Sequence, residues 1–585
     1  MKDIMFVTSM EQPELHHEVN GTLLLATRLL KAGFETDILH FWEAGDCGKD
    51  YEAFIKSMTE RLLVHTPGSV AFYCVWTNYH IMLRIAAEVK RAAPETVIVL
   101  GGPQASATAR DTLAAMPHVD YICTGEGENT VVPFFTALLR DGGQGMDTIP
   151  GLFYRKDGQI VKNDLELPLC DLDAEPRWDE RLFVGRYEES PEKLSSDTYY
   201  MPIDAGRGCP YNCTFCCTSH FWRRTYRMKS AERIVADIRY FKERFGIRSF
   251  WFSHDAFTIN HKLVEQVCDY IIEQDLDICW RCSTRIDCIT EELLMKMKQA
   301  GMTDIEVGIE TGSKRMQKLT NKRLDLERAQ EKIRFMLKNG LRVSLFFMYG
   351  FPEETEADLN DTLELMFTLV DMGVQSIIMA YTRFNPATQI AEDHMDELIL
   401  DPKIKVLTRA VFGYEEEKVH IAQHKTVFPF FYHLGTPVRE NFQYVIFFTH
   451  VYRQFPNAAR YLRKLYEGDN LRFYRDFCEV NEGCFAEDMD HATREVVDNP
   501  LELMENMLQK FDGEWVEQLR GLMRYDWDQH RVSKSKEDIS LQETYDFVIM
   551  DLQRRRPIQQ FAKGKTTLVM EKKNGVARVK ILDVR

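Results

Sequence analysis

Short apolar runs alternate with amphipathic stretches through the first 145 residues. The runs "DIMFVT", "FETDILHF", "GSVAFYCVW", "ETVIVLGGP" and "VDYICTGEGE" are separated by stretches with helical apolar spacing, such as "GTLLLATRLLKAG" and "HIMLRIAAEVKRAA". Continuous apolar runs are typical of strands buried on both faces, and strands joined through helices predict a parallel, doubly wound sheet. Ligands of such α/β sheets bind at the carboxyl ends of the strands, so we expect a binding site there.

The pattern lapses over residues 146–195 and then resumes. "GLFYRKDGQIVKN" predicts a hairpin that turns at Asp157-Gly158, and "LPLCDLDAEPRW" indicates an extended linker. From 196 to 398, six apolar strands again alternate with amphipathic helices. Eight such units close a barrel, so six predict a partial (β/α)6 barrel with its chemistry at the carboxyl ends of the strands.

Residues 399–585 predict a mainly helical third domain. "FPFFYHLGTPVRENFQYVIFFTHVYRQF" carries aromatic residues at helical spacing, and the end of the chain predicts a hairpin across Asn574-Gly575. We expect this domain to cover the barrel mouth and to shape a substrate pocket.

Composition narrows the class of protein. Of the 585 residues, 45% are hydrophobic and 28% charged, and the net charge of -17 argues against a nucleic-acid-binding surface. The N-terminus lacks the pattern of a signal peptide, and no apolar stretch is long enough to predict a membrane span, so we expect a cytoplasmic protein. Fourteen cysteines are too few for a disulfide scaffold in a chain of this length.

The cysteines gather at one place, in "GRGCPYNCTFCCTSHFW" directly after the first barrel strand. Cys209, Cys213 and Cys216 have the spacing of metal ligands, and Cys217 follows at once. A four-thiolate site would need Cys217, although adjacent side chains rarely bind the same small cluster. A zinc ion held by the three cysteines and His220 is a second possibility. The third is an iron–sulfur cluster with three protein ligands and one open iron, which the position at a barrel mouth favours.

Two strand-end loops of the first domain are rich in glycine. Glycine permits close approach of a ligand to the backbone, and adjacent carboxylates favour hydroxyl or amide donors over phosphate. The loops contain Gly101, Gly102, Gly125, Glu126, Gly127 and Glu128. Since no Gly-x-Gly-x-x-Gly follows the first strand, a nicotinamide or flavin site is disfavoured.

The cysteine spacing, with Phe215 before the third cysteine, resembles the radical S-adenosylmethionine (radical SAM) signature. The order "GGPQAS", "TGEGEN", hairpin and "LPLCDLDAEP" is similar to the branch of that family with an N-terminal cobalamin-binding domain. The resemblance extends from residue 1 to about residue 395. It implies that the three cysteines hold a 4Fe–4S cluster whose open iron binds S-adenosylmethionine. Reductive cleavage then gives a 5′-deoxyadenosyl radical that abstracts a hydrogen atom from the substrate.

The resemblance also implies roles for five strand-end or loop residues. Phe215 would pack near the adenine, Arg285 would bind the methionine carboxylate and Glu310 the ribose hydroxyls, while Ser253 and Asp255 would complete the S-adenosylmethionine site. It identifies no further catalytic residue.

Cobalamin is the implied ligand of the two glycine-rich loops. Cobalamin modules that supply an axial histidine carry Asp-x-His-x-x-Gly, whereas this chain has "PELHHEVNG", in which neither His16 nor His17 has that spacing. We therefore expect cobalamin bound without a protein histidine, or a domain that persists as a scaffold.

The expected function is an enzyme that methylates or rearranges an unactivated carbon. Its expected partners are a small-molecule or peptide substrate and a low-potential electron donor of the flavodoxin or ferredoxin type. Alternatives are a cobalamin-independent radical SAM enzyme and a non-catalytic cobalamin sensor or carrier. A tRNA methylthiotransferase would need a clustered second set of cysteines, but Cys47, Cys74 and Cys123 are scattered.

Overall fold

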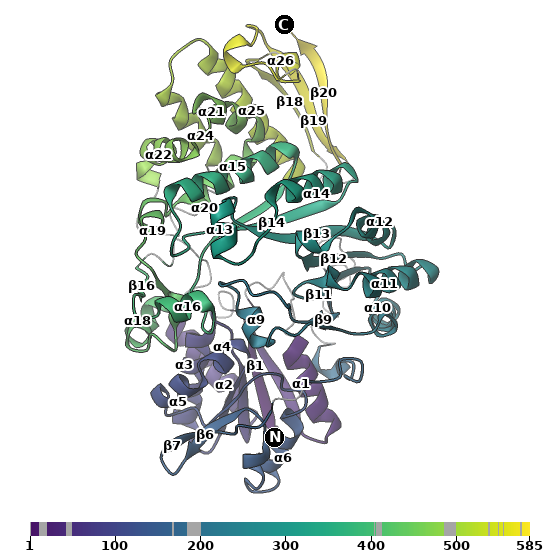
Figure 1. Cartoon of the computed structure of the whole chain (residues 1–585), viewed down its shortest axis with the longest axis vertical. Helices are drawn as coiled ribbons and strands as arrows, with labels where there is room; N and C mark the ends of the chain where they lie inside the picture. The colour runs from purple at the N-terminus through teal and green to yellow at the C-terminus, as the bar shows by residue number, and fades with distance from the viewer. Residues whose placement is uncertain are drawn as a thin grey trace.

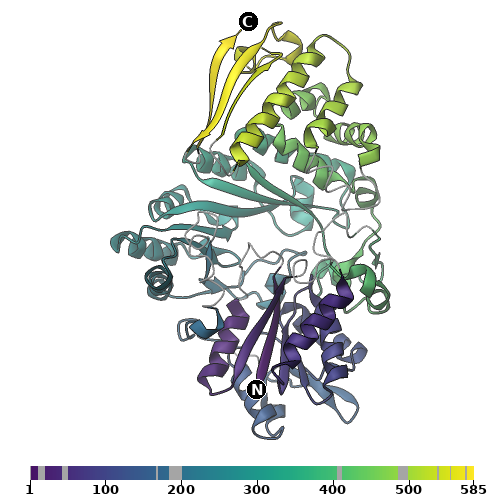
Figure 2. The same ribbon diagram turned by 180° about the vertical axis from the view of Figure 1, so that it is seen from behind.

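The computed structural model describes residues 2–10, 20–42, 50–166, 169–183, 200–402, 404, 412–484, 499–535, 539–547, 549–553, 555–573 and 576–584. Three parts follow one another along the long axis (Figure 1): the N-terminal domain, a central sheet with helices, and the C-terminal helices and sheet. The view from behind shows the same order (Figure 2).

The N-terminal domain is the predicted doubly wound sheet. Its parallel strands have the order β2-β1-β3-β4-β5, and the hairpin β6–β7 extends the sheet in the antiparallel direction. Asp157 and Gly158 turn the hairpin, both with positive φ (52° and 74°), as a two-residue turn of this type requires. The strands are β1 (Ile4–Met10), β2 (Thr36–Trp42), β3 (Ser69–Tyr73), β4 (Val97–Gly101), β5 (Tyr121–Cys123), β6 (Leu152–Lys156) and β7 (Gln159–Lys162). The helices are α1 (Asn20–Lys31), α2 (Tyr51–Leu63), α3 (Tyr79–Ala92), α4 (Pro103–Ala107), α5 (Ala109–Ala115) and α6 (Val131–Leu139).

The central domain is the predicted six-stranded partial barrel, with parallel strands in the order β8-β11-β12-β13-β14-β15. Local capping fixes its helices: the Ser230 side chain caps the start of α10, and Thr355 and Asp358 form a capping box at the start of α15. The strands are β8 (Met201–Asp204), β11 (Ser249–Ser253), β12 (Cys279–Thr284), β13 (Met302–Glu310), β14 (Arg342–Tyr349) and β15 (Ser376–Tyr381). The helices are α10 (Ala231–Phe245), α11 (His261–Glu273), α12 (Glu291–Gln299), α13 (Lys314–Leu319), α14 (Leu326–Lys338) and α15 (Glu356–Met372).

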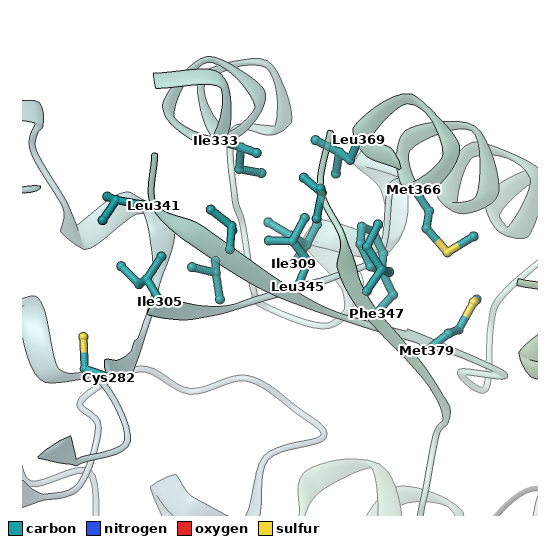
Figure 3. Close-up of a cluster of buried hydrophobic side chains, with 14 of the residues drawn as sticks. Cys282, Ile305, Ile309, Ile333, Leu341, Leu345, Phe347, Met366, Leu369 and Met379 are labelled. Atoms are coloured by element: carbon teal, nitrogen blue, oxygen red, sulfur yellow. The ribbon is translucent and has the colours of Figure 1, made fainter. Parts of the chain in front are cut away.

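Alternate side chains of these strands point to opposite faces of the sheet. Buried residues such as Ile305, Leu345 and Phe347 lie on the helix side, near Ile333 of α14 and Met366 of α15 (Figure 3). The residues between them face the interior of the partial barrel and are half-buried or exposed. Examples are Trp251, Arg281, Glu306 and Phe346, with Ile378 47% exposed.

The C-terminal part attaches to the other two domains. Phe428 and Phe431 pack on the first domain, against Tyr79 and His80 of α3. Tyr452 of α20 instead stacks on Phe367 of α15, with ring centroids 3.8 Å apart. The aromatic segment that we expected to cover the barrel mouth therefore has two different neighbours.

Short elements follow the barrel and lead into a helical bundle with a sheet. The predicted final hairpin corresponds to β19 and β20, whose turn at Asn574-Gly575 lies outside the described residues, and β18 adds a third strand. The elements are α16 (Gln389–His394), β16 (Ile399–Leu400), α18 (Tyr414–Gln423), β17 (Tyr432–His433), α19 (Pro437–Asn441), α20 (Val445–Gln454), α21 (Pro456–Leu465), α22 (Asn470–Val480), α24 (Pro500–Asn506), α25 (Trp515–Lys534), β18 (Ile539–Tyr545), α26 (Ile549–Gln553), β19 (Thr566–Lys573) and β20 (Val576–Val584).

Candidate active site

The cysteine loop, residues 206–222, begins directly after β8, and Gly208 shapes its start. Short strands β9 (Gly206–Arg207) and β10 (Arg227–Met228) pair antiparallel at its base. Gly208 has φ 86°, and a Cβ there would overlap the carbonyl oxygen of Thr225. The Gly208 N–H donates to Asp255 Oδ2 at 2.8 Å, so Asp255 ties this loop to the carboxyl end of β11.

The other side of the loop is held by the turn that follows α13. The N–H of Thr214 donates to the Thr320 carbonyl oxygen at 3.0 Å, and the Asn321 side chain donates to the Asn212 carbonyl oxygen at 2.7 Å. Both bonds involve the backbone next to Cys213. Two distant segments therefore fix the loop that carries the candidate ligands.

The three candidate ligands are half-buried free thiols. Burial raises the pKa of Cys209 to about 11 and also raises the pKa of Cys213, whereas the positive charges of Lys322 and Arg285 act against the shift at Cys213. Metal binding removes these protons, since the thiolate is the ligand form.

The thiols are not arranged around a single ion. Within the described part of the chain, one set of three or more His, Cys, Asp or Glu ligand atoms lies within 4.8 Å of one another, and that set is Glu126, Glu128 and Cys170. Zinc held by the three cysteines and His220 would require such a gathering. Thiolates that bind different iron atoms of one cluster stand farther apart, so the donor set fits an iron–sulfur cluster.

Arg285 lies at the end of β12, beside the cluster ligands. Its Nη1 is 3.7 Å from the Cys213 sulfur, and its guanidinium lies 3.8 Å from the centre of the Tyr211 ring. Nε and Nη2 donate to the two Asp287 oxygens at 3.1 and 2.8 Å, and Nη2 also donates to the Lys322 carbonyl oxygen. We expected the guanidinium to bind the methionine carboxylate through two nitrogens. Nε and Nη2 instead bind Asp287, and Nη1 is the nitrogen that lies next to the cysteine loop.

Glu310 ends β13 at a β-bulge and has φ 69°, an uncommon conformation outside glycine. Lys322 donates to Glu310 Oε1 at 3.0 Å, and both side chains are at least nine-tenths buried. Nothing in the sequence spacing indicated Lys322 or Asp287 as members of the site, because both reach it only through the tertiary fold.

The remaining predicted residues lie on neighbouring strand ends. The Ser253 carbonyl oxygen accepts a hydrogen bond from Ala205 N–H, and burial raises the pKa of Asp255. The Phe215 ring packs edge-on against Phe351 after β14, with centroids 5.7 Å apart. Asp255 and Arg285 contact the cysteine loop, Phe215 belongs to it, and Ser253 and Glu310 end the strands β11 and β13. The roles of all five in binding S-adenosylmethionine stay predictions.

A cavity of about 260 Å³ lies between the carboxyl edge of the N-terminal sheet and the short helix α9 (Cys217–Phe221). Figure 1 shows α9 between β1 and the central strands. The lining residues are Trp76, Pro103, Gln104, Ser106, Ala107, Thr124, Gly125, Phe153, Lys162, Cys217, His220, Phe221, Arg223, Pro386 and Ala387. Gln104 is 1% exposed; its amide donates to the Val427 carbonyl oxygen, while its Oε1 has no hydrogen-bond partner in the described structure. A ligand that carries amide N–H groups would satisfy this oxygen.

Of the six residues expected to contact cobalamin, Gly125 lines this cavity. Gly102 has φ 94°, and a Cβ there would lie 2.7 Å from the Cys74 carbonyl oxygen, so its close approach is to the protein backbone. A Cβ on Gly127 would meet Leu25 of α1 at 3.0 Å. Gly101 ends β4 and borders Cys123. His16 and His17 lie outside the described residues.

Glu126 and Glu128 point toward the barrel. Arg207 Nη1 is 2.6 Å from Glu128 Oε1, and Arg227 pairs with Glu126, which also accepts the Cys170 N–H at 3.1 Å. Both carboxylates are more than nine-tenths buried. We call Glu126, Glu128, Cys170, Arg207 and Arg227 the domain interface. It contains the set of close ligand atoms described above, and the guanidinium groups of Arg207 and Arg227 neutralise the two carboxylates of that set without a metal ion.

Comparison with known protein families matches residues 203–366 to the radical SAM superfamily and residues 10–134 to the B12 binding domain. The chain therefore contains a radical SAM domain and a B12 binding domain. Both matches lie within the domains expected from the sequence, and they confirm an enzyme with the predicted cofactor classes: a 4Fe–4S cluster, S-adenosylmethionine and cobalamin.

Two named relatives each align with somewhat more than half of this chain. An uncharacterized methyltransferase of Pyrococcus horikoshii is 27% identical over 347 residues, 59% of this chain and 71% of that protein. The anaerobic magnesium-protoporphyrin IX monomethyl ester cyclase of Rubrivivax gelatinosus is 27% identical over 345 residues, 57% of this chain and 60% of the cyclase.

The fold has a solved counterpart in the cobalamin-dependent S-adenosylmethionine radical enzyme OxsB, with TM-score 0.56 and 14% identity over 91% of this chain and 84% of OxsB. The likeness at this identity concerns the fold. Among the helices of the described chain, none combines the length and apolar character needed to span a membrane.

Proposed function

We propose that this radical SAM protein is a cobalamin-dependent methyltransferase that acts on an unactivated carbon of a small organic substrate. The observation that carries the proposal is the cavity shared by the strand ends of the B12 binding domain and the cysteine loop. A cofactor in this cavity would lie against the loop that holds the cluster. A domain kept only as a scaffold has no need of a cavity on this face.

The residues divide between the three expected cofactors. Cys209, Cys213 and Cys216 would hold the cluster, while Arg285, Glu310, Ser253, Asp255 and Phe215 would contact S-adenosylmethionine. Gln104, Ser106 and Gly125 would contact cobalamin from the B12 domain. When bound, these groups supply a substrate radical and an activated methyl group, which is chemistry that protein side chains lack.

The residues of the chain itself position the bound groups and exclude water from the site. Arg285 places a positive charge beside Cys213 in a buried setting, where an anionic ligand group is stabilised more than in water. Half-buried apolar residues of the barrel interior, such as Phe346 and Met348, offer a surface for an apolar part of the substrate.

Methyl transfer predicts two products from S-adenosylmethionine. The anaerobically reconstituted enzyme, loaded with hydroxocobalamin and reduced, should form both 5′-deoxyadenosine and S-adenosylhomocysteine, measured by liquid chromatography with mass detection. A reaction that uses S-adenosylmethionine only as a radical source gives 5′-deoxyadenosine alone. That result would replace methyl transfer by rearrangement or ring closure as the function.

Filling the cavity should remove cobalamin and spare the cluster. Ala107→Trp places an indole in the cavity wall and should weaken equilibrium binding of hydroxocobalamin at least about tenfold, or about 1.4 kcal/mol. Iron content should stay at the parent value. The matched control is Ala114→Trp on the exposed side of α5, which should bind as the parent does. Parent-like binding by Ala107→Trp would place cobalamin elsewhere.

A further inference from the structure

The segment "SKRMQKLTNKR", residues 313–323, is basic within an acidic chain. Five of its eleven residues are lysine or arginine and none is acidic, while the whole chain has a net charge of -17. It forms α13 and the turn that holds the cysteine loop. A positive surface next to the cluster ligands therefore needs an explanation.

Three of the five cations have partners. Lys322 is buried against Glu310, Lys314 pairs with Glu327 at 2.8 Å, and Arg315 pairs with Asp358 at 2.5 Å.

Lys318 and Arg323 are exposed and form no ion pair with the described residues. Leu319 lies between them in the chain and exposes 45% of its surface, so an apolar group stands beside the two cations. We call Lys318, Leu319 and Arg323 the basic patch.

The basic patch is close to the candidate cluster ligands through the backbone. Thr320, next to Leu319, accepts the hydrogen bond from Thr214, which follows Cys213. Lys322, next to Arg323, accepts from Arg285, whose other terminal nitrogen is near the Cys213 sulfur. A partner on this patch would be separated from the cluster by one loop.

The surface beyond the patch has the opposite charge. A cavity of about 100 Å³ is lined by Leu319 of the patch and also by Glu353 and Asp393. An acidic partner that is attracted to Lys318 and Arg323 is repelled near these two carboxylates, so its orientation on this surface is restricted.

We propose that the basic patch is the docking surface for an acidic, low-potential one-electron carrier protein. The inference rests on the proposed function, because reductive cleavage of S-adenosylmethionine requires one electron from outside the chain. The electron passes from the reduced carrier to the cluster; the carrier is oxidised, the cluster is reduced, and no covalent bond forms or breaks. Charge complementarity raises the association rate of such partners and makes it sensitive to salt.

The test compares a protein carrier with a small reductant. Lys318→Glu/Arg323→Glu and the neutral Lys318→Gln/Arg323→Gln are prepared with reconstituted cluster. Stopped-flow absorbance follows cluster reduction by an acidic flavodoxin and by dithionite, and calorimetry measures flavodoxin binding. At low salt we expect the charge-reversed variant to bind flavodoxin at least about tenfold more weakly and to be reduced correspondingly more slowly. The neutral variant should be intermediate, the difference should shrink in high salt, and dithionite should reduce all variants equally.

Arg334→Glu/Lys338→Glu is the matched control. It makes the same change in net charge at exposed positions of the carboxyl-terminal half of α14, away from the barrel mouth, and should behave as the parent with both reductants. If the Lys318→Glu/Arg323→Glu variant bound flavodoxin as the parent does, the proposal that the basic patch is the docking surface would be wrong. An equal loss with dithionite would also overturn it, since that shows damage to the cluster loop. Cluster reduction requires no cleavage of S-adenosylmethionine, so the docking result stands apart from the proposed function.

Discussion

Replacing Cys209, Cys213 and Cys216 together by alanine is expected to abolish the iron–sulfur cluster and every trace of S-adenosylmethionine cleavage. The reconstituted parent should contain about four iron atoms per chain, and the triple variant essentially none. The physical reason is that these thiols lie on one loop fixed from both sides, by Asp255 through Gly208 and by the turn at Thr320 through Thr214.

Cys217 provides the internal control. It is adjacent to Cys216 but begins helix α9 and lines the cavity next to the B12 domain. Cys217→Ala should therefore retain the iron and the visible absorbance of the parent. Iron analysis and absorbance after anaerobic reconstitution decide the matter. Loss of iron in Cys217→Ala, or stoichiometric zinc in place of iron, would contradict the three-ligand cluster.

The two sheets could be predicted because their signals are local. Continuous runs such as "SVAFY" and "VIVLG" are apolar at nearly every position, as expected of strands covered on both faces. Some helices also begin at a capping side chain, as α2 does at Asp50 and α10 at Ser230. The three cysteines could also be identified as candidate metal ligands from the sequence, because all three lie within eight residues at a spacing typical of such ligands. The strand β18 was missed since five of the seven residues of "ISLQETY" are exposed, which leaves little apolar pattern.

The surroundings of the site could not be predicted because they depend on contacts far apart in the chain. Glu126 and Glu128 looked like ligand contacts, but their partners Arg207 and Arg227 are some eighty to one hundred residues away, and no spacing rule connects them. Asp287 likewise takes the edge of Arg285 that suits a carboxylate. Charged residues at strand ends indicate a site, but whether they face a ligand or each other is decided by the docking of the domains.

The domain interface around Arg207 explains how the B12 cavity and the cysteine loop keep their relative position. Arg207 stands two residues before Cys209 and contacts Glu128 at 2.6 Å, Asp204 at 3.4 Å and the Cys170 sulfur at 3.5 Å. One buried guanidinium thus connects the B12 domain, the linker and the base of the cysteine loop. A buried charge in such a network is costly to leave without its partner.

The carboxylates of the interface give it a pH dependence. Burial raises the pKa of Glu126, but its hydrogen bonds with Cys170 and the charges of Arg227 and Arg207 outweigh burial and hold the pKa below its ordinary value. For Asp204 burial also raises the pKa, and Lys229 and Arg207 reverse the direction. Carboxyl groups with lowered pKa values stabilise the folded state above their unfolded pKa of about 4, and this contribution is lost as the pH falls through the folded values.

Arg207→Ala should consequently destabilise the protein by about 3–5 kcal/mol, because Glu128 stays buried without its cation. Denaturant unfolding at neutral pH measures the loss, and the cycle of Arg207→Ala, Glu128→Gln and the double variant isolates the pair. The double variant should recover part of the stability, since it removes both charges.

Lys563→Ala is the control, because both side chains of its ion pair are more than three-quarters exposed, and it should cost under about 1 kcal/mol. Below pH 4 the difference between parent and Arg207→Ala should narrow, as Glu126 and Asp204 become protonated. Additive effects in the cycle, or a loss no larger than that of Lys563→Ala, would show that the arginine does not hold the two domains together.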